Sequence, residues 1–330
     1  KTRLITKNKI LFKMKILAND GISQSGVDLL EKNGHEVILT KVAQEQLEHY
    51  INTHLVDAIL VRSATKVRKD LIEACPSLKL IGRGGVGLDN IDVAYAKSKG
   101  LKVINTPAAS SESVAELVLA HMLSGARQLN KSNREMPLEG DSKFKELKKA
   151  YAKGIELSGK TLGIIGIGRI GQTLAKKAIG LGMKVVVTDQ FIDTVDVELD
   201  FFDGQKISFN LKSISLDALL KQADFVSLHV PAQKDYILGA KEFEMMKNTA
   251  AIVNTARGGV VDEKALLEAL KDKKLGFAAL DVFEEEPTPP IKLLMCPDLS
   301  LSPHIGGATL EAQDRIGTEL AEQIIEFAKH

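Results

Sequence analysis

The chain has 330 residues, a formal net charge of +1 and an apolar fraction of 44%. This length predicts about two domains, and the apolar fraction is typical of a folded globular chain rather than a disordered one. The balanced charge argues against nucleic acid or an anionic membrane as a partner, because such binding depends on excess positive charge.

The two cysteines, Cys75 and Cys296, do not make a disulfide framework and show no metal-ligand spacing, so we expect no metal and a reduced, cytoplasmic protein. Apolar runs are broken well short of a membrane span, so no membrane partner is expected. The first thirteen residues are basic and lack the apolar core of a signal peptide, and we expect Met14 to be the start.

From Met14 onward, short apolar runs alternate with longer stretches of helical periodicity. The strands are predicted at 15–18, 36–39, 58–61, 78–81 and 102–104. The helices between them are predicted at 23–32, 43–51, 70–74 and 92–99. This alternation indicates βαβ units and a parallel sheet.

A break at 105–109 precedes one long predicted helix at 110–129, and residues 130–155 form a polar, Lys-rich stretch that we expect to be an exposed arm. A second αβ series follows, with strands predicted near 161–165, 184–188, 225–228, 251–254, 276–280 and 299–302. One helix at 310–329 ends the chain.

Two strictly alternating segments, 195–201 and 207–211, flank Asp203-Gly204. Alternation around this dipeptide predicts a β-hairpin. A dinucleotide fold needs only a simple connection at this point, so the hairpin is predicted to be an insertion.

The glycine motif of the second series runs from Gly166 through Gly168 to Gly171, after one predicted strand and at the start of a helix. Glycines at this spacing allow a tight turn, close approach of a pyrophosphate and close packing of helix on strand. Asp189 ends the next strand, where its carboxylate can bind both ribose hydroxyls and repel a 2′-phosphate. The motif therefore predicts NAD rather than NADP as the cofactor; the alternative is a structural glycine turn with a helix-capping aspartate.

Further polar residues follow the later strands, where open α/β sheets bind ligands. Arg257, Glu286 and His304 lie after three successive strands. An arginine can bind a carboxylate and polarise a keto oxygen, a histidine can exchange the hydroxyl proton, and a glutamate can favour the protonated histidine. The three residues together favour reduction of a 2-keto acid, although each residue alone is typical of a surface charge or a helix cap.

These motifs resemble the D-isomer-specific 2-hydroxyacid dehydrogenase family over essentially all of residues 14–330. The resemblance implies two doubly wound α/β domains: a Rossmann NAD-binding domain (108–307) inserted into a flavodoxin-like substrate domain (1–107 and 308–330). It also implies that Arg257, Glu286 and His304 are catalytic. The implied cofactor-binding residues are Gly166, Gly168, Arg169, Ile170, Gly171, Asp189, His229, Pro231, Thr255, Ala256, Asp281, Gly306 and Gly307.

Within the family, the first domain resembles the branch that acts on D-3-phosphoglycerate. Arg62 and Arg83 follow predicted strands, and two guanidinium groups suit a phosphate. The implied substrate-binding residues are Arg62, Ser63, Arg83, Val86, Gly87 and Arg257. The alternative is that both strand-end arginines make surface ion pairs.

The resemblance implies NAD-dependent oxidation of D-3-phosphoglycerate to 3-phosphohydroxypyruvate, the entry to serine biosynthesis, by a homodimer that binds its small substrate. Other family reactions, on glyoxylate, hydroxypyruvate or 2-oxoglutarate, remain open, as does an NAD-sensing binding protein like the corepressors that share the fold. Since the chain ends after one helix, we expect no appended regulatory domain and no serine feedback through one.

Overall fold

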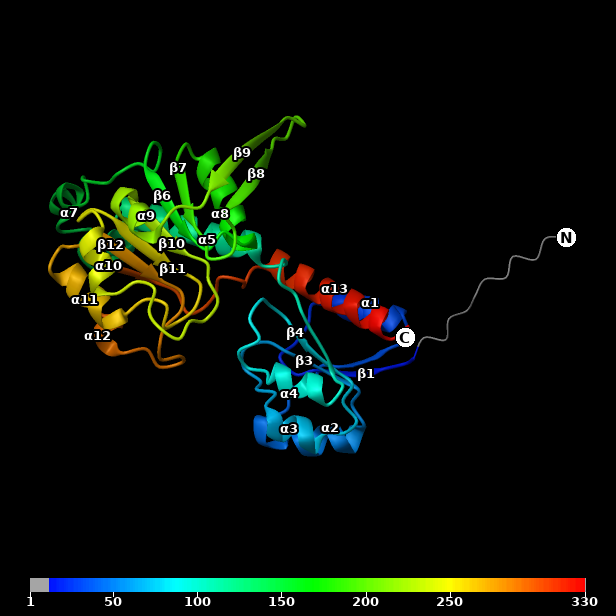
Figure 1. Cartoon of the computed structure of the whole chain (residues 1–330). Coiled ribbons are helices and arrows are strands. Elements are labelled where there is room, and N and C mark those ends of the chain that lie inside the picture. The colour runs from blue at the N-terminus through cyan, green and yellow to red at the C-terminus, as the bar shows by residue number, and fades with distance from the viewer. Residues whose placement is uncertain (1–11, 330) are drawn as a thin grey trace. The chain divides into compact units, whose positions relative to one another are not determined.

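The computed structural model describes residues 12–329, so most of the basic leader lies outside the described residues. Two compact units make up the chain (Figure 1). The first contains residues up to Ser110 together with those from Gly307 onward, and the second contains Ser111–Gly306. The second unit is therefore inserted into the first.

The first unit is built on a five-stranded parallel sheet with the order β2-β1-β3-β4-β5. This is the flavodoxin-like order, as expected. Its strands are β1 (Lys15–Ala18), β2 (Glu36–Ile38), β3 (Ala58–Val61), β4 (Leu80–Arg83) and β5 (Lys102–Asn105). Its helices are α1 (Gln24–Lys32), the 3-10 turn η1 (Gln44–Gln46), α2 (Leu47–His54), α3 (Lys69–Ala74), α4 (Val93–Ser98) and α13 (Leu310–Phe327).

Helices cover both faces of this sheet because successive strand residues point to opposite sides. Ile59 packs with residues of α2, α3 and α4 in one apolar cluster, whereas Leu60 packs with α1 and α13 in another. The helices α1 and α13 lie side by side (Figure 1) and cross closely at Gly26, where an added Cβ would come 2.7 Å from the carbonyl oxygen of Gly317. The final helix thus completes the core of the first unit.

The second unit is built on a six-stranded parallel sheet with the order β13-β12-β11-β10-β6-β7. Its strands are β6 (Thr161–Ile165), β7 (Lys184–Thr188), β10 (Phe225–Leu228), β11 (Ala251–Asn254), β12 (Phe277–Leu280) and β13 (Leu299–Leu301). Ser213 forms one parallel bridge with Val187 on the outer side of β7. Counting this bridge as a reduced third strand gives the Rossmann order 3-2-1-4-5-6 with one strand added.

Helices also cover both faces of the second sheet. The helices of this unit are α5 (Ser111–Ala126), α6 (Leu129–Glu139), α7 (Phe144–Ala150), α8 (Arg169–Gly180), α9 (Leu216–Gln222), α10 (Ala240–Met245), α11 (Glu263–Lys271) and α12 (Ile291–Leu294). Val253 faces the cluster formed with α5 and α8, whereas Ile252 faces the cluster formed with α9, α10 and α11.

The predicted hairpin is present as β8 (Thr194–Asp200) and β9 (Lys206–Lys212), and it projects from the second unit in Figure 1. Its strands pair antiparallel, with Val197 opposite Phe209. Val197 is buried against the apolar cluster that includes α8. The base of the hairpin is therefore part of the core, although its tip is exposed.

The predicted helix at 110–129 is wrong at its end, because the chain breaks after α5. Gln128 adopts the left-handed conformation with φ of 54°, and α6 begins at the next residue. The Lys-rich arm also contains two helices, α6 and α7, that the polar composition did not reveal. Within residues 12–329, no helix combines the length and apolar character needed to cross a membrane.

Candidate active site

The glycine loop after β6 forms an open cradle. Gly166 has φ of 93°, and a Cβ there would come 2.5 Å from the carbonyl oxygen of His229. A Cβ on Gly171 would come 2.2 Å from the carbonyl oxygen of Gly166. Gly168 instead faces open space, and it begins α8 without a side-chain cap. The start of this helix can therefore receive an anion; Arg169 and Ile170 form its first turn.

Asp189 lies directly after β7 and is tied to the glycine loop. Its Oδ2 accepts a hydrogen bond from the Ile167 N–H at 2.8 Å, and its Oδ1 accepts from the N–H groups of Phe191 and Ile192 at 2.9 and 3.1 Å. The Asp189 N–H in turn donates to Ser213 Oγ at 2.9 Å. These bonds fix the carboxylate beside the cradle, where ribose binding is expected.

Two buried polar atoms on neighbouring loops have no hydrogen-bond partner among the described residues: His229 Nδ1 after β10 and Thr255 Oγ1 after β11. Burial lowers the pKa of His229 to about 3, so this ring is neutral at physiological pH. Its Nε2 shares a hydrogen bond with Ser227 Oγ at 2.9 Å. Unsatisfied buried polar atoms are rare, so these two atoms, with the open glycine cradle, fit a bound dinucleotide.

Asn254 shapes the turn that carries Thr255, Ala256 and Arg257. Its Oδ1 accepts from the Ala256 N–H at 3.0 Å, and its Nδ2 donates to the Arg257 carbonyl at 2.9 Å. Arg257 Nη1 donates to the Ala256 carbonyl at 2.6 Å. A Cβ on Gly258 would come 1.9 Å from the carbonyl oxygen of Phe283, so this turn packs closely on the loop that leads to Glu286.

His304 and Glu286 form a direct pair. His304 Nδ1 lies 2.9 Å from Glu286 Oε2, and Glu286 Oε1 accepts from the Phe283 N–H at 3.1 Å. The carboxylate accepts the Nδ1 proton, so Nε2 of the neutral ring holds a lone pair for proton exchange. The two side chains are 45% and 37% exposed, which leaves them accessible to a substrate.

Asp281 is buried and holds the loop on which His304 lies. Its Oδ1 accepts from Ser302 Oγ and the Ile305 N–H at 2.5 and 2.9 Å, and its Oδ2 accepts from the Gly306 N–H at 2.8 Å. Its backbone carbonyl accepts from the His304 N–H at 2.8 Å. Asp281, expected to contact the cofactor, thus has both carboxylate oxygens bound to this loop.

All of these residues follow the carboxyl ends of strands in one parallel sheet, and they therefore lie along one edge of it. Pro231 lies two residues beyond His229, in the loop after β10. Gly307 instead falls in the first unit, where an added Cβ would come 3.2 Å from the Ser110 Cβ. The two chain crossings between the units therefore adjoin at this point.

The first unit has its own set of predicted residues at the carboxyl edge of its sheet. Arg62 directly follows β3, and Arg83 is the last residue of β4 rather than the residue after it, opposite Val61. Ser63 and Val86 are exposed. A Cβ on Gly85, two residues before Gly87, would come 2.1 Å from Arg83 Nη1, so this guanidinium lies on the glycine-rich loop.

Asp20 and Asn90, which the sequence did not single out, fix the Arg62 loop. Asp20 Oδ2 accepts from the N–H groups of Arg62 and Thr65 at 2.6 and 3.0 Å. Asn90 Nδ2 donates to the carbonyls of Arg62 and Thr65 at 2.7 and 2.6 Å. The only sequence signal for Asp20 is its place after the first strand, at the reversal of strand order where ligands bind.

The sequence model described as "D-isomer specific 2-hydroxyacid dehydrogenase, NAD binding domain" matches residues 119–306. The chain is 43% identical to D-3-phosphoglycerate dehydrogenase of Methanocaldococcus jannaschii over 94% of its own length, and it spans 57% of that protein. It is also 43% identical to hydroxypyruvate reductase of Thermotoga maritima, covering 94% of this chain and 97% of that protein.

A solved structure of NAD⁺-bound 3-phosphoglycerate dehydrogenase from Entamoeba histolytica has a TM-score of 0.74 and 28% identity to this chain. The alignment covers 96% of this chain and 95% of that structure. The similarity therefore extends over both units.

Proposed function

Because the chain belongs to the D-isomer-specific 2-hydroxyacid dehydrogenase family, we propose that it oxidises D-3-phosphoglycerate to 3-phosphohydroxypyruvate, as at the entry to serine biosynthesis. The observation that carries the reaction type is the His304–Glu286 pair, with its hydrogen bond of 2.9 Å and its accessible ring. The cofactor is NAD, which this family's nucleotide domain binds.

NAD, when bound, supplies the hydride acceptor for carbon 2 of the substrate. His304 Nε2 removes the proton of the 2-hydroxyl, while Glu286 holds the Nδ1 proton and stabilises the imidazolium that results. Arg257 binds the carboxylate and stabilises the developing carbonyl oxygen. The glycine cradle, Asp189 and the orphaned Thr255 Oγ1 are the groups proposed to hold the cofactor.

The choice of substrate rests on the first unit. Arg62 and Arg83 occupy the ends of adjacent strands, and the Asp20 and Asn90 bonds fix the Arg62 backbone. Two guanidinium groups held at one sheet edge suit a phosphate. We therefore assign the substrate phosphate to Arg62 and Arg83, with Ser63, Val86 and Gly87 in the same loops.

A second candidate is reduction of hydroxypyruvate or glyoxylate. The hydroxypyruvate reductase of Thermotoga maritima is as similar as the phosphoglycerate dehydrogenase of Methanocaldococcus jannaschii, and it matches this chain over 97% of its own length rather than 57%. The alternative from another functional class is an NAD-sensing binding protein. It predicts NAD binding without turnover of any substrate.

The deciding experiment measures NADH formation with D-3-phosphoglycerate and D-glycerate, and NADH consumption with hydroxypyruvate and glyoxylate. The proposal predicts the highest kcat/KM among the oxidations for D-3-phosphoglycerate. Faster turnover of unphosphorylated acids would support the second candidate, and NAD binding without any turnover would support the sensing role.

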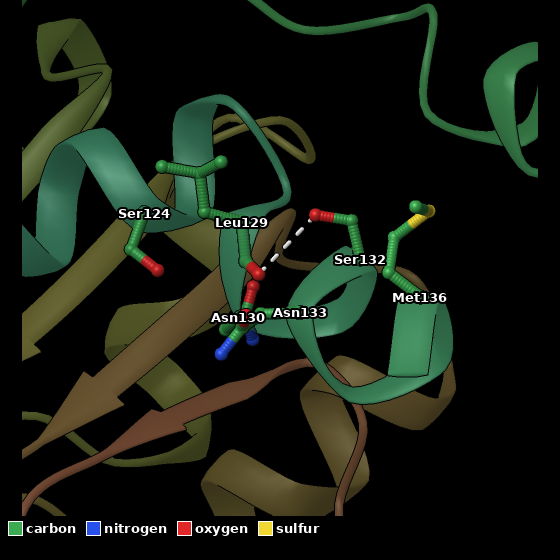
Figure 2. A pocket seen from close by; sticks show the side chains of 6 residues that line it. All are labelled: Ser124, Leu129, Asn130, Ser132, Asn133 and Met136. Carbon is green, nitrogen blue, oxygen red and sulfur yellow. Dashed lines mark hydrogen bonds between the residues drawn. The ribbon is translucent and has the colours of Figure 1, made fainter. Parts of the chain in front are cut away.

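We also propose a homodimer in a cytoplasmic setting. Exposed apolar side chains gather on α5 through α7, among them Leu123, Leu129, Met136 and Leu138. Figure 2 shows a pocket on this surface whose lining is Ser124, Leu129, Asn130, Ser132, Asn133 and Met136. Clustered exposed apolar surface is typical of a subunit interface; a monomer by light scattering would contradict the dimer.

A further inference from the structure

One histidine lies within the apolar core of the second unit. His121 is on the face of α5 that also carries the buried Val118 and Met122. Its ring lies between two serines near the end of β13, with Nδ1 2.9 Å from Ser300 Oγ and Nε2 2.9 Å from Ser302 Oγ. Both serines and the histidine are buried.

The direction of each hydrogen bond in this group can be assigned. The Asp281 carboxylate only accepts, so the Ser302 hydroxyl donates to Asp281 Oδ1, and its oxygen is left to accept from His121 Nε2–H. Burial lowers the pKa of His121, although the nearby Asp281 charge acts in the opposite direction. The ring is therefore neutral at physiological pH. Nδ1 then accepts from the Ser300 hydroxyl. One tautomer of His121 therefore satisfies every hydrogen bond in this series.

This series of hydrogen bonds, from His121 through Ser302 to Asp281, ends at the loop that presents His304. Asp281 accepts from the N–H groups of Ile305 and Gly306, and its carbonyl accepts from the His304 N–H. His304 has φ of 55°, a conformation that a non-glycine residue keeps only when its surroundings hold it there. The orientation of the Asp281 carboxylate is therefore what fixes the loop.

We propose that His121 is a positioning residue, which orients Asp281 through Ser302 and thereby fixes the loop that presents His304. The inference rests on the proposed function only in taking His304 as the proton acceptor. The competing explanation is that His121 merely fills space in the core. The two differ because filling space needs volume alone, whereas positioning needs a donor at Nε2.

The test compares His121→Leu with His121→Gln in the full chain. The leucine keeps an apolar volume and removes both ring nitrogens, whereas the glutamine amide can donate to Ser302 again. Met122→Leu, on the adjacent buried residue, is the matched control. Ser302→Ala removes only one hydroxyl and should have the same effect on kcat as His121→Leu. It replaces His121→Leu in the test if the leucine variant does not fold.

We expect His121→Leu and Ser302→Ala to lower kcat about tenfold or more, since small displacements of a reacting group are costly, while KM and NAD affinity stay within about twofold. His121→Gln should recover most of kcat, and Met122→Leu should match the wild type. Unchanged kcat in a folded His121→Leu protein, or no recovery with glutamine, would overturn the inference.

A second readout does not depend on turnover. Hydrogen exchange of the peptide containing residues 302–307 should accelerate in His121→Leu and Ser302→Ala but not in Met122→Leu. Unchanged exchange in both would refute the positioning role even if the wild type acted on none of the acids tested. Absence of wild-type turnover would contradict the proposed function and leave this measurement to decide the role of His121.

Discussion

The proposed reaction gives each side chain of the His304–Glu286 pair a distinct task. Glu286 is itself held by the Phe283 N–H, so the carboxylate faces Nδ1 and directs the exchangeable proton to Nε2. In the proposed reaction the carboxylate also stabilises the imidazolium that forms when His304 takes a proton. The pair thus sets the tautomer in which His304 is proposed to act as a base.

Glu286→Gln keeps the hydrogen-bond acceptor and removes the charge. Proton transfer to His304 then lacks the charge that stabilises the imidazolium, so kcat for oxidation should fall about tenfold or more. Steady-state rates at saturating substrate check this; an unchanged kcat would remove Glu286 from the role. Glu285→Gln, one residue earlier, is the control.

Asp189→Asn tests the cofactor preference. The amide removes the charge that repels a 2′-phosphate and weakens the bonds to ribose, so the ratio of kcat/KM for NAD to that for NADP should fall about tenfold or more. Asp193→Asn removes the same charge four residues later and should leave the ratio unchanged. If Asp189→Asn kept the wild-type ratio, another group would set the preference.

Residues that act through a neighbour were hard to predict. Asp189, Arg257 and His304 follow strands of one sheet, so chain order alone places them at one edge. His121 gives no such signal, because its partners Ser300 and Ser302 are about 180 residues away in sequence. Asp20 is similar, since the N–H groups it binds belong to the loop after β3, more than 40 residues away in sequence.

At the scale of elements, two hydrogen bonds connect α11 to the loop that carries Glu286. The Glu284 N–H donates to Glu263 Oε1 at 2.8 Å, and the Glu263 N–H donates to Glu284 Oε1 at 3.2 Å. Burial, reinforced by the nearby charges of Glu284 to Glu286, raises the pKa of Glu263. The contact therefore buries a carboxylate, and in its ionised form this group lowers the free energy of unfolding.

Glu263→Gln keeps the acceptor for the Glu284 N–H and removes this charge. The raised pKa means that the folded state binds a proton more tightly than the unfolded state, so the ionised group destabilises the fold at high pH, and the penalty falls as the pH drops toward 4.5. The variant should have a higher Tm than the wild type at pH 8, and the difference should shrink toward pH 5. Glu268→Gln, exposed on α11, should show no such trend; a constant difference would contradict the argument.

The β8–β9 hairpin combines a buried base with an exposed tip. Phe202 is fully exposed, whereas Val197 is 1% exposed in the core beside α8. Replacing residues 199–207 with a short polar turn should leave kcat within about threefold and Tm nearly unchanged, because only exposed or half-exposed residues are lost. Replacing 195–211 should also retain kcat but lower Tm, since burial of one such side chain contributes about 1.5–3 kcal/mol. Loss of kcat with the fold intact would show that the hairpin serves the active site.

Local pattern predicted most elements because each carries its own signal. The hairpin follows from strict alternation, and β6 with α8 follows from the glycine motif between them. The strand predicted at 78–81 instead runs from Leu80 to Arg83, because the Leu78 N–H closes a turn on the Cys75 carbonyl. The division between α5 and α6 was not predictable, since it depends on one left-handed residue, Gln128.

At the scale of the whole molecule, the order of the strands explains the organisation. The glycine motif begins only at Gly166, after a complete five-stranded αβ unit, and the final helix returns to that unit. The observed crossings lie at Ser110–Ser111 and Gly306–Gly307, a few residues from the expected boundaries. We propose that the inserted unit holds the cofactor and the first unit holds the substrate phosphate, and substrate selectivity tests this division.

The most direct test is the ratio of kcat/KM for D-3-phosphoglycerate to that for D-glycerate, measured in the wild type, Arg62→Ala and Arg83→Ala. A charge-assisted contact contributes about 1.5–3 kcal/mol, or roughly ten- to a hundredfold in binding. The account predicts a wild-type ratio well above one that falls by such a factor in each variant, with NAD affinity unchanged. A wild-type ratio near one, or equal losses on both substrates, would contradict the assignment of D-3-phosphoglycerate as the substrate.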